Sequence, residues 1–277
     1  MSNLKILLRN YPQIYKWFGP WLQQLRKVGG PEDYRVILNE LERVRSGSVQ
    51  EEPEENLVRL ERHLETSSKV CKDFNCLFQE KSELGDDVRI ANATIFDKLA
   101  EIRAIFGLDR LSFKNIEFIK NPDIFAIFGY RKFLVEVTRL GFSPGKRRNV
   151  VWDGDTTENS GVRVRHMHKD GRFVKTFPEV IYHKVVEKYK QLKNSQREAD
   201  KWMVWISSGR DYLTVSDYSL EYTEPVSVMP DTKLALEHAM RQIKDDRLCA
   251  GLSHIVLSLG RDDPDLVSPE LSETATA

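Results

Sequence analysis

The chain has 277 residues, of which 40% are hydrophobic and 30% are charged. Its 42 lysine and arginine residues balance 42 aspartate and glutamate residues, so no overall basic field attracts nucleic acid. No apolar run approaches the ~20 residues that a membrane-spanning helix needs, and the N-terminus lacks the apolar segment of a signal peptide. Three cysteines without metal-ligand spacing indicate reduced thiols. These features predict a cytoplasmic protein without a membrane segment.

The first 88 residues are predicted to form a helical region. Aromatic and apolar residues recur at helical spacing over 15–25, until a Gly-Gly-Pro sequence at 29–31 ends the pattern. Further helices are expected over 31–44 and 57–70, where leucine and valine follow the same periodicity. We interpret this region as a helical cap, an oligomerisation element or a partner-binding surface, and we expect its apolar stripes to pack as core.

From residue 95 the sequence alternates between helix and strand periods. The first helix is expected to end at Gly107, because glycine is a common helix stop, and Asp170-Gly171 predicts a β-hairpin turn. The polar, proline-containing tail from Arg261 is expected to be disordered. The expected elements are a helix over 95–107, strands over 113–119, 124–128 and 133–140, a hairpin over 162–177, a helix over 178–192, a strand over 201–207, a helix over 232–246 and a strand over 254–259.

Two acidic residues stand among the predicted strands. Asp123 follows Asn121-Pro122 at the end of one strand, and Glu136 lies inside the next, beyond a short turn. Because side chains alternate along a strand, strand pairing would bring the two acids together on one sheet face. A carboxylate inside a strand is costly without compensation, and hard cations such as Mg²⁺ take oxygen ligands. The pattern therefore predicts a divalent-cation site.

Pro122-Asp123 followed by Glu136, together with the order of elements around them, resembles the PD-(D/E)XK nuclease superfamily. The resemblance implies an α/β fold with a restriction-endonuclease-like αβββαβ core over 89–260. A helical N-terminal region over 1–88 would precede this core, and a disordered tail over 261–277 would follow it. The resemblance also implies a Mg²⁺- or Mn²⁺-dependent nuclease that hydrolyses phosphodiester bonds of DNA.

Particular residues acquire roles through this resemblance. Asp123 and Glu136 would bind the metal ion as catalytic residues. Glu101, on the helix before the first acid strand, would complete the metal site. Asp97, one helical turn earlier, is the rival for that place, and the alternative for Glu101 is a solvated helix glutamate.

The chain departs from the superfamily pattern at Thr138, where a lysine is expected. Lys132 shares the face parity of the second acid but lies far along the strand, and Arg139 points the other way by alternation. Lys184 and Lys188 line one stripe of the following helix. We expect one of these two lysines to supply the missing charge, the alternative being a solvated lysine face.

Basic residues gather in and before the predicted hairpin, although the net charge of the chain is zero. Such a basic patch would contact the phosphate backbone of DNA, largely without regard to sequence. An ordinary solvated loop is the alternative. The residues are Lys146, Arg147, Arg148, Arg163, Arg165 and Arg172.

Two other functions fit the same sequence. Thr138 in place of the lysine would suit a catalytically inactive protein that binds nucleic acid or a protein as a module. Alternatively, the helical region over 1–88 would be the functional part and would bind a protein partner or form a homodimer. Trp17, Phe18 and Trp21 would then be its anchors, because aromatic side chains dominate interface energetics.

Overall fold

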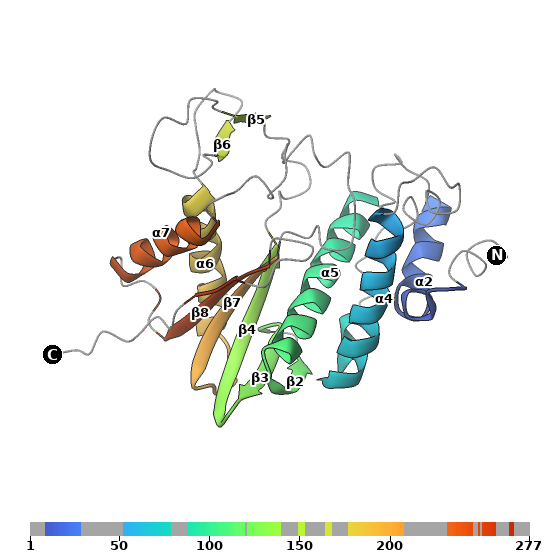
Figure 1. Cartoon of the computed structure of the whole chain (residues 1–277), viewed down its shortest axis with the longest axis horizontal. Helices are drawn as coiled ribbons and strands as arrows, with labels where there is room; N and C mark the ends of the chain where they lie inside the picture. The colour runs from blue at the N-terminus through green and yellow to red at the C-terminus, as the bar shows by residue number, and fades with distance from the viewer. Residues whose placement is uncertain are drawn as a thin grey trace.

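The protein has an α/β fold in which a mixed sheet lies between two groups of helices, as Figure 1 shows. This computed structural model describes residues 9–28, 52–78, 88–119, 121–139, 149–152, 164–167, 177–207, 232–245, 249, 251–258 and 266–268. The α/β class predicted from the sequence is confirmed. In the described part of the chain, no helix is long and apolar enough to cross a membrane.

The predicted elements that the structure describes follow one another in the expected order, and additional short strands occur at 71–72, 149–152 and 266–267. The helices are α2 (Pro12–Val28), α4 (Glu52–Val70), α5 (Val88–Arg110), α6 (Phe177–Lys193) and α7 (Thr232–Asp245), with a short 3₁₀ helix, η2 (Phe74–Phe78). The strands are β1 (Cys71–Lys72), β2 (Lys114–Phe118), β3 (Ile124–Phe128), β4 (Arg131–Arg139), β5 (Asn149–Trp152), β6 (Val164–Met167), β7 (Lys201–Ser207), β8 (Leu252–Ser258) and β9 (Leu266–Val267). The run α5, β2, β3, β4, α6 and β7 is the helix, three strands, helix and strand expected between residues 95 and 207.

Strand β4 lies at the centre of the main sheet. Among the described residues this sheet has seven strands in the order β1-β2-β3-β4-β7-β8-β9, and β5 and β6 form a separate ribbon. β4 pairs antiparallel with β3 on one side and parallel with β7 on the other. Its residues from Phe133 to Thr138 are all buried, because helices cover both faces of the sheet. A charged residue within this stretch therefore needs a partner.

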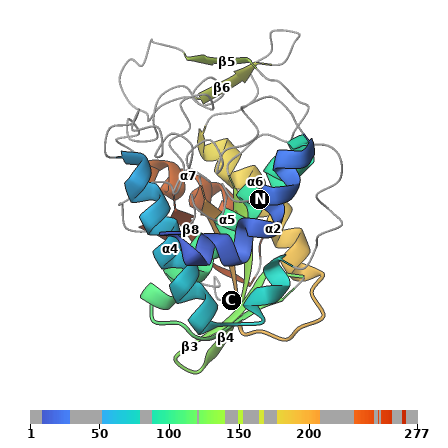
Figure 2. The same ribbon diagram turned by 90° about the vertical axis from the view of Figure 1, so that its right-hand side faces the viewer.

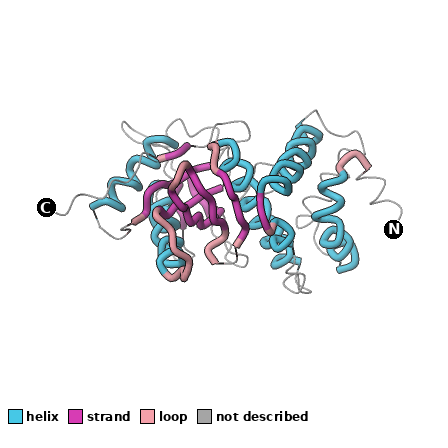
Figure 3. The backbone as a smooth tube through the Cα atoms, turned by 90° about the horizontal axis from the view of Figure 1, so that it is seen from below, coloured by secondary structure: helices cyan, strands magenta, loops and turns pink. Residues whose placement is uncertain are grey.

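Alternate side chains of β4 face different helix layers, which Figures 1 and 3 show on either side of the sheet. Val135 and Val137 pack in the cluster that contains residues of α2, α4 and α5. Leu134 packs instead with residues of α6 and α7. Glu136 and Thr138 share the parity of Leu134 and therefore lie on the α6 side.

The described helices of the N-terminal region belong to the same core as the sheet. Phe18 and Leu64 are fully buried in a cluster that also contains sheet residues. The Glu61 carboxylate of α4 accepts hydrogen bonds from the backbone amides of Gln13 (2.6 Å) and Ile14 (2.9 Å) at the start of α2. It thereby satisfies donors that have no partner within the helix. The described residues of the apolar stripes in α2 and α4 are core, as expected, and the boundary drawn before α5 separates segments that share this core.

Several predicted element bounds need correction. α5 begins at Val88 and continues past Gly107 to Arg110, because the fully buried Leu108 keeps this last turn in the core. Cys71–Lys72 form a strand within the region predicted to be helical. Phe177 is the first residue of α6 rather than the last residue of a hairpin strand.

Two further predictions concern segments that the structure describes only in part. β6 pairs with β5, whereas the predicted turn at 170–171 and the predicted helix over 31–44 lie outside the described residues. In the tail, β9 pairs with β8, and the buried Ser268 hydroxyl accepts a 2.9 Å hydrogen bond from the Ile255 amide. The expectation of disorder is therefore wrong for 266–268, and the rest of 261–277 lies outside the described residues.

Candidate functional site

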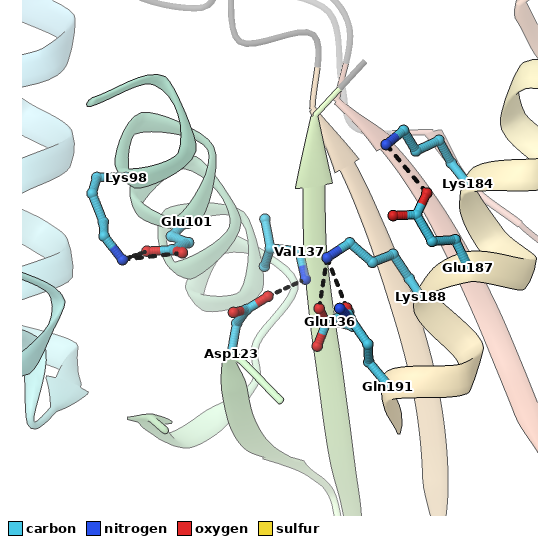
Figure 4. A network of polar contacts seen from close by, with 9 residues as sticks. All are labelled: Lys98, Glu101, Asp123, Glu136, Val137, Lys184, Glu187, Lys188 and Gln191. Carbon is cyan, nitrogen blue, oxygen red and sulfur yellow. Dashed lines mark hydrogen bonds and ion pairs between the residues drawn. The ribbon is translucent and has the colours of Figure 1, made fainter. Parts of the chain in front are cut away.

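Two carboxylates meet where the β3–β4 ladder ends, as Figure 4 shows. Ile124 pairs with Val135 in the ladder, so the next residues along, Asp123 and Glu136, lie opposite each other. Asp123 Oδ2 accepts a 2.7 Å hydrogen bond from the Val137 amide. The backbone amide of Asp123 in turn donates to Glu136. Both bonds give partners to backbone donors at the end of the ladder, and the predicted meeting of the two acids is confirmed.

Lys188 of α6 supplies a cation to this pair. Its Nζ atom lies 2.9 Å from Glu136 Oε1 and 2.8 Å from Gln191 Oε1 (Figure 4). α6 directs its buried residues, including Val185 and Leu192, toward the sheet. Lys188 follows one turn after Val185 and one turn before Leu192, so its stem runs along this buried side and its ammonium reaches the strand.

The other cations that the sequence offered do not reach Glu136. Lys184 lies 3.4 Å from the exposed Glu187, on the same helix. Arg139 forms a 2.6 Å ion pair with Asp97 of α5. Lys132 is exposed and four residues from Glu136, which corresponds to about 13 Å along a strand. Of the two lysines expected to compensate for Thr138, Lys188 is thus the one brought to the acid pair.

Glu101 approaches the site from α5, and Lys98 accompanies it. Lys98 Nζ lies 3.0 Å from Glu101 Oε2, and both side chains are about nine-tenths buried. The negative charge of Asp123 contributes to the raised pKa of Glu101, so the two carboxyl groups interact electrostatically. Asp97, the rival for this role, is paired with Arg139 and its side chain is 55% exposed.

The carboxyl groups of the cluster favour their protonated forms. Burial, followed by the nearby Asp123 charge, raises the pKa of Glu101 to about 8 and that of Glu136 to about 7. Burial also raises the pKa of Asp123, although the Val137 amide and Lys188 oppose the shift. The pKa of Lys188 is raised as well: burial favours the neutral amine, but the Glu136 and Asp123 charges outweigh it. The cluster therefore retains protons near neutral pH that a divalent cation would displace.

The two carboxylates fit a hard cation that needs only one or two ligands from the protein. The described residues hold no group of three or more histidine, cysteine, aspartate or glutamate side chains arranged to bind a metal ion. Mg²⁺ is commonly bound by one or two carboxylates, with water and substrate phosphate oxygens completing its octahedron. Asp123 and Glu136 offer two such carboxylates. The prediction that Glu101 completes the site is not supported, because the described residues form no three-ligand group and Glu101 pairs with Lys98.

The predicted basic patch is not assembled by the described residues. Lys146, Arg147, Arg148, Arg163 and Arg172 lie outside them. Arg165 belongs to β6, where its backbone pairs with Val151 of β5. DNA contact by these residues stays a prediction.

Lys98 was missed by the sequence reasoning. It precedes Glu101 by three residues on a helix, the spacing at which opposite charges meet on one face. The sequence therefore contained a signal for this pair. The burial of Lys98 could not be predicted, because it depends on the packing of α5 against the sheet.

Comparison with known protein families, with curated proteins and with solved structures gave no significant match to this chain.

Proposed function

We propose that this protein is a metal-dependent nuclease with a restriction-endonuclease-like core, and that it hydrolyses phosphodiester bonds of DNA. The observation that carries the proposal is the 2.9 Å contact between Lys188 and Glu136 beside Asp123. It joins two strand carboxylates and one helix cation in a single buried cluster. The helix thereby offers the positive charge that Thr138 lacks.

Asp123 and Glu136 would hold a Mg²⁺ or Mn²⁺ ion between them, without Glu101, which pairs with Lys98 on α5. A bound ion of this kind lowers the pKa of water and stabilises negative charge on the phosphate. Lys188 would neutralise and orient the scissile phosphate through its ammonium group. Gln191, which accepts a 2.8 Å hydrogen bond from that ammonium, would keep it aimed at the site.

The test uses purified wild-type protein and a Glu136→Gln variant, which keeps the shape of the side chain and removes its charge. Both would be incubated with plasmid and with single-stranded DNA in Mg²⁺, in Mn²⁺ and in EDTA. Cleavage is expected only with metal and only for the wild type. Glu187→Gln is the matched control, because Glu187 is an exposed acid of α6 that pairs with Lys184. Equal cleavage by the wild type and Glu136→Gln would refute the proposal.

A catalytically inactive binding module is the second candidate. Two observations favour it: Thr138 replaces the expected lysine, and the Glu136 charge already has a partner in Lys188. Such a protein would bind DNA or a protein while Mg²⁺ and Mn²⁺ left its melting temperature unchanged. A metal-dependent rise in melting temperature that disappears in Glu136→Gln would exclude this candidate.

The structure argues against the third function, protein binding through aromatic anchors of α2, because the described anchors pack with the core. Phe18 is fully buried and packs edge-on against Phe78, with ring centroids 5.1 Å apart. Trp17 stacks on Phe78 at 5.3 Å and is also packed against the core. The side chain of Trp21 lies outside the described residues. Both described aromatic residues therefore stabilise the fold.

A further inference from the structure

We propose that the β3–β4 turn is a contact for unpaired nucleic acid, in which exposed aromatic rings stack on bases and neighbouring cations hold phosphates. This inference rests on the proposed function for the class of partner. The turn forms the lower end of the sheet in Figures 1 and 2, at the opposite end of β3 from Asp123.

Two large aromatic side chains are exposed in this turn. Tyr130 is 86% exposed and Phe128 is 49% exposed. Exposure of large aromatic side chains to water is unfavourable, and tight turns usually contain glycine, asparagine or aspartate instead. Among the exposed large hydrophobic residues of the described chain, these two are the aromatic ones, and a single glycine separates them. Their shared position indicates a common partner.

Contacts within the protein hold both rings in place. Phe128 packs against Phe113, with ring centroids 5.1 Å apart. The guanidinium carbon of Arg131 lies 5.7 Å from the centroid of the Tyr130 ring. Gly129 has a φ of 60°, which lets the chain reverse within two residues. These contacts restrict the motion of both rings before binding, which lowers the entropic cost of binding a partner.

Cations flank the turn on both faces of the sheet: Arg131 shares the face of Phe128, whereas Lys132 and Lys114 both pair with Ile127 and lie on the other face. Arg131 and the exposed Lys132 follow the turn directly, and the exposed Lys114 stands on β2 opposite Ile127. Asp200 also lies at this end, and its carboxylate accepts a 2.7 Å hydrogen bond from the Lys132 amide. The turn thus combines two exposed rings with three neighbouring cations.

This combination fits a single strand of nucleic acid. Alternating rings and cations bind unpaired bases and the phosphates between them, and every base has a face on which a ring can stack. A protein partner would need far more surface than two side chains supply. Five residues separate Asp123 from Phe128, or about 17 Å along an extended strand, so the turn would be a contact separate from the carboxylate pair.

The experiment measures the affinity of full-length protein for a fluorescent oligothymidylate of about 16 nucleotides, a length that covers a typical single-strand site. EDTA prevents cleavage, and a duplex of the same length serves as the competing probe. Tyr130→Ala is expected to weaken single-strand binding about tenfold, the loss typical of one stacked base, and to change duplex binding little. Tyr130→Phe should bind like the wild type. Leu234→Ala is the matched control, because Leu234 is a comparably exposed apolar residue on α7.

Equal binding by the wild type and Tyr130→Ala would overturn the inference, as would an equal loss in Leu234→Ala or the absence of single-strand binding by the wild type. The proposed function has a separate readout. Metal-dependent cleavage that requires Glu136 but is unaffected by Tyr130→Ala would retain the nuclease and reject the turn. Single-strand binding that requires Tyr130, without metal-dependent cleavage, would retain the turn and reject the nuclease.

Discussion

The carboxylate of Asp123 and the backbone amide of Val137 are joined by a 2.7 Å hydrogen bond at the end of the β3–β4 ladder. This bond gives Asp123 a structural role in addition to the proposed metal ligation. The two roles require different atoms, because the bond to Val137 uses Oδ2 and the second carboxylate oxygen remains for an ion.

Substitution of Asp123 should separate these roles. Asp123→Asn keeps an oxygen that accepts the Val137 hydrogen bond but loses the negative charge, so its stability should remain near that of the wild type. Asp123→Ala leaves the buried amide without its acceptor and should cost about 1–3 kcal/mol of unfolding free energy. Urea denaturation of the metal-free proteins measures both. A similar stability of the two variants would argue against the structural role, and a retained Mg²⁺-dependent thermal shift in Asp123→Asn would argue against the metal role.

Lys188→Met should lower cleavage by roughly 100-fold or more, because it removes a charge that stabilises the transition state. Thr138→Lys in the same protein should restore part of the lost rate. Thr138 has the face parity of Glu136, and position 138 is where the superfamily resemblance expects the lysine. Lys184→Met is the control and should leave the rate near that of the wild type, since Lys184 pairs with Glu187. An equal loss in both methionine variants would show that Lys188 has no special role.

Metal binding should stabilise the protein more at about pH 8 than at about pH 6. Burial raises the pKa of Glu101 to about 8 and that of Glu136 to about 7, so the folded protein holds protons here that the unfolded chain has released. These groups stabilise the fold below their unfolded pKa, and that stabilisation is lost as the pH rises through the folded values. A metal ion replaces the protons, so its effect grows over the same range. Melting temperatures with Mg²⁺ and with EDTA across this range test the prediction, which a pH-independent metal shift would contradict.

Lys98→Met should destabilise the fold more at high pH than at low pH. It leaves the buried Glu101 without its 3.0 Å partner, and breaking a buried ion pair costs about 3–5 kcal/mol when the remaining charge stays ionised. At about pH 6 the raised pKa of Glu101 allows it to be neutral, and removal of Lys98 raises that pKa further, so the loss should become large only above about pH 8. Adding Glu101→Gln to Lys98→Met should recover stability at about pH 9, because no charge remains unpaired. Denaturant titrations at both pH values measure these losses. If the losses of unfolding free energy in the two single variants simply add in the double variant, Lys98 and Glu101 do not act as a pair.

Leu64→Ala should cost about 2–5 kcal/mol of unfolding free energy, because Leu64 is fully buried in the core that α4 shares with the sheet. Val58→Ala on the same helix should change stability by less than about 0.5 kcal/mol, since Val58 is 54% exposed. Both would be measured by urea denaturation, with hydrogen exchange of the backbone amides of α4 and β7 to follow the helix and the sheet separately. A loss of helix signal in Leu64→Ala without loss of the sheet would show that the N-terminal helices fold independently.

The elements that the sequence predicted well have unambiguous local patterns. The bounds of β3 and β7 match the predicted strands at 124–128 and 201–207, because short apolar runs between turn signals leave little choice of register. α5 was predicted too short at both ends, since Gly107 looks like a stop and only the burial of Leu108 carries the helix beyond it. Propensity at one residue is worth about 1 kcal/mol, which the burial of a leucine outweighs.

The sequence by itself determined which chemical groups are available and which face of β4 carries Glu136, because the alternation of side chains along a strand is a local property. Tertiary structure alone decided the partners of those groups. Lys188 and Glu136 are 52 residues apart, and their contact depends on how α6 packs against the sheet. Likewise, Lys98 is a buried partner of Glu101 only because α5 lies on the opposite layer. Burial sets both the pKa of each carboxyl group and its need for a counter-charge, and burial is a property of the whole fold.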